Sequence, residues 1–150
     1  MELKKQPIKR FLLITLLLVF ATYLNGCCPC YFSNISQTTT GVKGQFDVLF
    51  NAATDDYSNH LQDVTNAGTV IDQAISTNAK RKCKTMVAMW GQIKNKNSNG
   101  VYDNFVRTWK NGHTLNPITI SSVKSRVTLL LDSINSGEDK IKKAGKKECK

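Results

Sequence analysis

This 150-residue sequence is poor in the side chains that carry most enzyme chemistry. It has only two histidines, His60 and His113, and beyond residue 27 only two glutamates, Glu138 and Glu148. General acid–base catalysis and metal binding depend on such side chains held in pairs or clusters. No Gly-x-Ser-x-Gly, His-Glu-x-x-His or phosphate-binding glycine loop occurs either. We therefore expect a protein that is not an enzyme and that binds no cofactor and no metal.

The sequence also has no segment in which apolar and polar residues alternate with period two, so a β-sheet fold is not expected. Apolar residues instead recur every three or four positions from Thr40 onward, as in amphipathic helices. The first such stripe contains Val42, Phe46, Leu49, Ala53, Tyr57, Leu61 and Val64. The clearest one contains Ile120, Val123, Val127, Leu130, Ile134 and Ile141. These patterns predict an all-α bundle of three to five helices.

Several helix boundaries follow from the same pattern. We expect a kink or break at Gly68, because glycine weakens a helix interior by about 1 kcal/mol. Segments 80–94 and 101–110 read as further helices, separated by an Asn- and Ser-rich loop. Thr119 or Ser121 is expected to cap the last helix. The aromatic residues of the two middle helices are expected in the core rather than on an exposed binding platform; they are Trp90, Tyr102, Phe105 and Trp109.

The first 27 residues have the organisation of a secretory signal. Four bases precede the uncharged apolar run Phe11–Tyr23, which is shorter than the ~20 residues that cross a bilayer as a helix. Leu24, Asn25, Gly26 and Cys27 follow, and this tetrapeptide resembles the lipobox of bacterial lipoproteins. It departs from the commonest pattern only at Asn25.

The resemblance implies that the Cys27 sulfur receives a diacylglycerol, that the chain is cut before Cys27, and that palmitate-type acyl chains anchor it to a membrane. Residue 28 is a cysteine and not the aspartate of an inner-membrane retention signal, so in a two-membrane host the outer membrane is expected. An ordinary signal peptide, which would release a soluble effector or toxin-like protein, is the alternative.

The expected organisation has four parts: a signal peptide over 1–26, a lipidated flexible tether over 27–39, a helical domain over 40–145, and a basic tail over 146–150. The tether prediction rests on Pro29 and on the uncharged Ser-, Thr- and Asn-rich composition that follows it.

Cys28, Cys30, Cys83 and Cys149 remain once Cys27 is assigned to lipid, and exported proteins keep disulfides. Four cysteines allow three connectivities, and spacing alone does not choose among them. Cys83 and Cys149 lie within or beside the folded part, which favours a bond between them. Cys28 and Cys30 then remain as acylation sites, as a local pair, or as thiols bonded to another chain.

Charge is divided unevenly along the chain. Residues 28–79 carry one base and five acids, whereas residues 80–150 carry sixteen bases and five acids. The densest basic positions are Lys80, Arg81, Lys82, Lys84, Lys146 and Lys147. A Cys83–Cys149 bond would join them into one patch for an acidic protein or glycan, although a solvated helix face and tail explain them equally well. An exported protein seldom meets nucleic acid, so no nucleic-acid partner is expected.

We therefore expect a non-enzymatic binding or scaffolding lipoprotein of the cell envelope. An accessory subunit of a secretion or conjugation machine and a surface adhesin both fit this description, and no residue chooses between them.

Overall fold

The structure is a computed structural model that describes residues 28–149 except 96 and 98. It confirms the all-α class, with five α-helices in the described part of the chain. The helices are α2 (Ile35–Ala52), α3 (Leu61–Lys80), α4 (Lys84–Ile93), α5 (Val101–Gly112) and α6 (Pro117–Lys143). A 3-10 turn, η1 (Tyr57–His60), and two short strands, β1 (Cys30–Tyr31) and β2 (Lys147–Glu148), complete the described elements.

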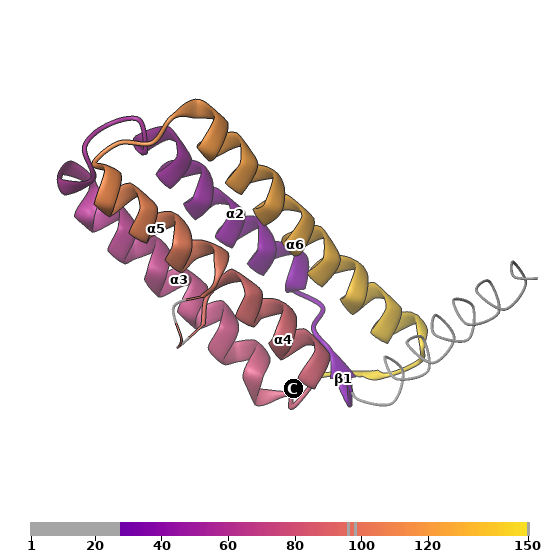
Figure 1. The fold of residues 1–150 in the computed structure, drawn as a ribbon. Helices are drawn as coiled ribbons and strands as arrows, with labels where there is room; N and C mark the ends of the chain where they lie inside the picture. Colours follow the sequence, from indigo (N-terminus) through magenta and orange to yellow (C-terminus); the bar gives the residue numbers. More distant parts are fainter. Residues whose placement is uncertain (1–27, 96, 98, 150) are drawn as a thin grey trace, which may run out of the picture.

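The helices form a four-rod bundle in which α4 and α5 lie end to end as one rod (Figure 1). Helix α2 packs against α3 and α6, while α4 packs against α3 and α6. Successive rods run in opposite directions, as short connections between neighbouring rods require. One end of the bundle carries β1, β2 and the α3–α4 turn, and η1 lies at the other end (Figure 1). We call these the strand end and the far end.

The core is built from the periodic apolar residues. Trp90 and Trp109 are fully buried, and Tyr102 and Phe105 are nearly so, which confirms that these aromatic residues are core and not a platform. The Tyr102 hydroxyl donates a hydrogen bond to the Val64 carbonyl at 2.6 Å. Fully or almost fully buried aliphatic side chains fill the remaining space; they include Val42, Leu49, Ile71, Ile93, Val127 and Ile134.

The first predicted stripe is divided between two helices. Helix α2 ends at Ala52, and the Asp56 carboxylate then accepts the backbone N–H of Ser58 at 2.8 Å to begin η1. Asp side chains that bond nearby backbone N–H groups often stabilise a turn in place of further helix, and this one ends the helical segment here. Leu61 consequently falls out of the stripe and is 54% exposed. The expectation of one helix through this region is therefore wrong.

Two further boundary predictions are also wrong. Helix α3 continues through Gly68, where an added Cβ would lie 2.8 Å from the Tyr102 hydroxyl oxygen, so this glycine makes room for a core side chain. Helix α6 begins at Pro117 rather than at a Thr119 or Ser121 cap. Asn116 is its N-cap, and its side chain accepts the Thr119 N–H at 2.9 Å.

The flexible tether expected over 27–39 is not found in the described residues. Cys28 is buried, and α2 already begins at Ile35, within the segment expected to be a tether. Strand β1 pairs in parallel with β2, which belongs to the expected tail. Both segments are thus part of the folded bundle, because disulfide bonds hold them there.

Candidate functional site

Two disulfides join both ends of the described chain to the strand end of the bundle. Cys28 bonds Cys83 with a Cα–Cα distance of 4.4 Å, and Cys30 bonds Cys149 with a Cα–Cα distance of 5.1 Å. The Cys149 N–H also donates to the Tyr31 carbonyl at 2.8 Å. The Cys83–Cys149 pairing expected from the sequence is therefore wrong. Cys83 and Cys149 each bond instead to a cysteine of the Cys-Pro-Cys segment, residues 28–30.

This connectivity still brings the two basic runs to one end. Lys82 directly precedes Cys83, and Lys147 pairs with Cys30 between the strands. Lys80, Lys82, Lys84 and Lys147 are exposed, and Lys146 is half-buried. Three further lysines from the end of α6 lie here: Lys140, Lys142 and Lys143. The Lys142 ammonium lies 5.6 Å from the centre of the Tyr31 ring.

Arg81 is not part of this surface, which corrects the sequence prediction for that residue. Its side chain is 1% exposed, and its Nη1 lies 2.6 Å from the Oε1 of Glu138, whose side chain is 3% exposed. The same Glu138 oxygen accepts the backbone N–H of Phe32. Arg81 Nη1 donates to the Cys30 carbonyl at 3.5 Å, and the guanidinium lies over the Phe32 ring. The buried pair thus connects the α3–α4 turn, α6 and the segment around β1.

A groove of about 850 Å³ runs between α4 and α6 from this same end. Its apolar lining consists of Met86, Met89, Leu129, Gly137, Ile141 and Ala144. Its polar lining includes Ser133, Ser136, Lys140 and Lys143. Cys28 lines it as well, so the groove and the first described residue are in direct contact. The groove could not be predicted from the sequence, because its two walls come from α4 and α6, which are separate helices far apart along the chain.

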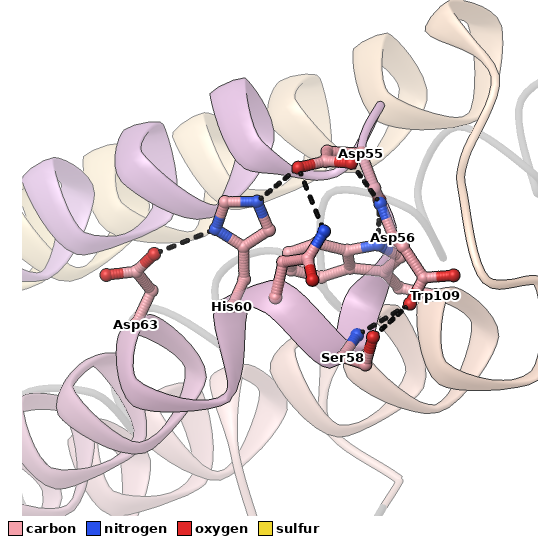
Figure 2. Close-up of polar contacts among 7 residues, drawn as sticks. Asp55, Asp56, Ser58, His60, Asp63 and Trp109 are labelled. Atoms are coloured by element: carbon pink, nitrogen blue, oxygen red, sulfur yellow. Dashed lines mark hydrogen bonds and ion pairs between the residues drawn. The ribbon is translucent and has the colours of Figure 1, made fainter.

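The far end carries a cluster of carboxylates around His60 (Figure 2). His60 Nδ1 lies 3.0 Å from Asp63 Oδ2, and His60 Nε2 lies 3.2 Å from Asp55 Oδ2. The Trp109 indole N–H donates to the Asp55 carbonyl at 3.0 Å, which fastens the turn to the core. The Ser58 hydroxyl bonds Asp56 at 2.6 Å and does not face the imidazole.

This arrangement favours a charged imidazolium. The hydrogen bonds to Asp63 and then Asp55 raise the pKa of His60. The backbone N–H of Asp56 and then the His60 side chain lower the pKa of Asp55, and the hydroxyl and backbone N–H of Ser58 lower the pKa of Asp56. With both ring nitrogens facing carboxylates, His60 suits a structural role rather than that of a base for a nucleophile. The His60–Asp63 spacing of three residues is the sequence signal for this contact.

These shifts predict an unfolding free energy with a maximum in mildly acidic solution. The His60 contribution is complete below its ordinary pKa of 6.5 and is lost as pH rises through the raised folded-state pKa. The Asp55 and Asp56 contributions are complete above 3.8 and are lost as pH falls through their lowered pKa values. Denaturant unfolding of His60→Gln between pH 5 and 9 should lose the alkaline decline. His113→Gln is the control, because that side chain is 77% exposed. Identical pH profiles for the wild type and His60→Gln would contradict the prediction.

The described residues contain no group of three or more histidine, cysteine or acidic side chains placed to hold a metal ion. Within the same residues, no helix combines the length and the apolar character that crossing a membrane requires. The predicted signal peptide and the Cys27 lipid site lie outside the described residues. Comparisons with protein-family models, curated proteins and solved structures find no match for this chain.

Proposed function

We propose that this protein is a non-enzymatic lipoprotein of the bacterial cell envelope, anchored through acyl chains on Cys27, with its strand end facing the membrane. The observation that carries this proposal is the place of Cys28. This residue follows the lipobox cysteine directly, and it lies at the end of the bundle where the exposed lysines gather. The acidic ligand expected from the sequence is then, in the first place, the phosphate headgroups of the membrane itself.

Electrostatics supports this orientation. Each lysine near an anionic lipid surface contributes ~1 kcal/mol of attraction, and the effect falls off within a Debye length. The acidic residues of the turn at the far end, Asp55, Asp56 and Asp63, are repelled by the same surface. Helix α6 has 27 residues. At 1.5 Å per residue it spans about 40 Å, so the far end stands well away from the bilayer and is free to contact a partner.

The lipid is tested by intact-mass measurement of the exported protein. We expect a mature chain that begins at Cys27 and carries the mass of the diacylglycerol and any further acyl chain. Cys27→Ser should remove that mass, block processing and abolish membrane retention, since only the thiol sulfur accepts the lipid. A wild-type chain of unmodified mass in the soluble fraction would contradict the proposal and favour a secreted effector.

Orientation is tested on the same lipidated protein by amine-reactive footprinting in vesicles. Lys82, Lys84 and Lys147 should react several-fold more slowly in anionic vesicles than in neutral ones, and high salt should remove the difference. Lys110 is the internal control, because it is exposed near the end of α5, towards the far end. Equal protection of all four lysines would contradict the orientation, while protection only after adding envelope extract would favour an acidic protein partner.

A further inference from the structure

The proposed membrane anchoring gives no role to the groove between α4 and α6. Its volume of about 850 Å³ falls in the range of sites that hold small organic ligands, roughly 300–1,000 Å³. Among the residues that line the groove, Leu129 is 68% exposed, whereas Met86 and Ile141 are buried. A ligand in the groove would remove this leucine from water. The shape and lining therefore suit a flexible apolar ligand.

The length of the groove suits an acyl chain. Its lining residues on α6 extend from Leu129 to Lys143, which at 1.5 Å per residue is about 21 Å. Acyl chains of one leaflet span about half of the ~30 Å hydrocarbon core of a bilayer. Methionine side chains on one wall adapt to irregular apolar ligands. Five polar residues of the lining are exposed, so their polar groups stay in contact with water: Asp132, Ser133, Ser136, Lys140 and Lys143.

The site of lipid attachment is next to the groove. Cys28 lines the groove, and the disulfide to Cys83 fixes its position at the start of α4. Cys27, which would carry the lipid, is bonded directly to this groove-lining residue, and consecutive Cα atoms are ~3.8 Å apart. We propose that one acyl chain on Cys27 lies in the α4–α6 groove while the other chains remain in the membrane. This inference rests on the proposed lipoprotein function.

Gly137 is the position at which a substitution can test the proposal. A Cβ at this position would lie 3.1 Å from the Met86 sulfur and 3.9 Å from the Met89 sulfur, so a larger side chain would enter the groove. Gly137→Leu therefore fills the site at a position already helical. Gly44→Leu is the matched control, because Gly44 is an exposed glycine of α2 with no atom within 4 Å of an added Cβ.

The experiment uses a palmitic acid analogue that carries a photoreactive diazirine, fed to cells that export the full chain. After irradiation of isolated membranes, peptides around Met86, Met89 and Leu129 should be joined to the Cys27 peptide through the lipid. Mass distinguishes this product from a cross-link to free phospholipid. Ile118, which is 82% exposed near the start of α6, reports non-specific labelling.

We expect groove cross-links at least five-fold above those at Ile118, reduced several-fold by Gly137→Leu and unchanged by Gly44→Leu. Cross-links distributed evenly over exposed apolar residues, or groove peptides joined only to phospholipid, would overturn the proposal while leaving the lipid on Cys27 established. Absence of any lipid on Cys27 would overturn the proposed function as well, so the two failures are distinguishable.

Discussion

Replacing Cys30 and Cys149 together by serine is expected to destabilise the protein more than most other pairs of substitutions. The two residues are 119 positions apart. In the chain-entropy account, removing a cross-link of that span lowers the free energy of unfolding by about 5 kcal/mol. The loss also leaves β2 held only by weak contacts, which are its two-residue pairing with β1, the Cys149 N–H to Tyr31 carbonyl bond and the Ser33 hydroxyl bond to Glu148. Urea denaturation should show a large fall in the midpoint.

The Cys28–Cys83 disulfide provides a comparison for the size of this stabilisation. Cys28 and Cys83 are 55 positions apart, which gives about 4 kcal/mol by the same account. Removing both bonds should cost less than the sum, because both hold the same Cys-Pro-Cys segment and the effects are coupled. A reducing agent should lower the midpoint of the wild type more than that of Cys30→Ser with Cys149→Ser. Peptide mapping that finds Cys83 joined to Cys149 would contradict this connectivity.

The helices could be predicted from the sequence where one face packs against the core throughout. Val127, Ile134 and Ile141 keep helical spacing and are all buried, so the prediction for the last helix is confirmed except at its start. Asn116 followed by Pro117 was an available signal for that start, since both residues are favoured there.

The helix break before η1 was harder to predict from the sequence. The apolar spacing continues from Ala53 to Leu61 across the turn, while the chain itself follows the local bonds of Asp55 and Asp56. The spacing of apolar residues predicts which face of a helix is buried. It does not reveal a turn stabilised by Asp side chains when the apolar spacing continues across that turn. The exposure of Leu61 is the consequence.

The contacts at the strand end could not be predicted from the sequence, because they join residues that are far apart along the chain. Arg81 looks like one member of a basic run, but its partner Glu138 is 57 positions away. The cysteine pairing likewise depends on where the Cys-Pro-Cys segment folds, and four cysteines allow three pairings. The exposed positions Lys80, Lys82 and Lys84 followed from the charge run, whereas the burial of Arg81 follows only from the tertiary structure.

The buried Arg81–Glu138 pair leads to the second large expected effect. Arg81→Met leaves the Glu138 carboxylate buried without a counter-charge, and such a change lowers the unfolding free energy by about 3–5 kcal/mol. Lys124→Met is the control, because the Lys124–Asp47 pair is exposed and should contribute less than about 1 kcal/mol.

A double variant separates the cost of the unpaired charge from the value of the pair. Adding Glu138→Gln to Arg81→Met removes the buried charge and keeps an oxygen that accepts the Phe32 N–H. Arg81 Nε and Nη2 and Glu138 Oε2 have no hydrogen-bond partner among the described residues, so the pair is incompletely satisfied and its net contribution is small. The double variant should therefore recover at least half of the stability lost in Arg81→Met, measured by urea unfolding at constant pH. The single variant Glu138→Gln is measured as well. If the stability lost in the double variant equals the sum of the losses in Arg81→Met and Glu138→Gln, the pair contributes through packing of the Arg81 side chain over Phe32 rather than through charge.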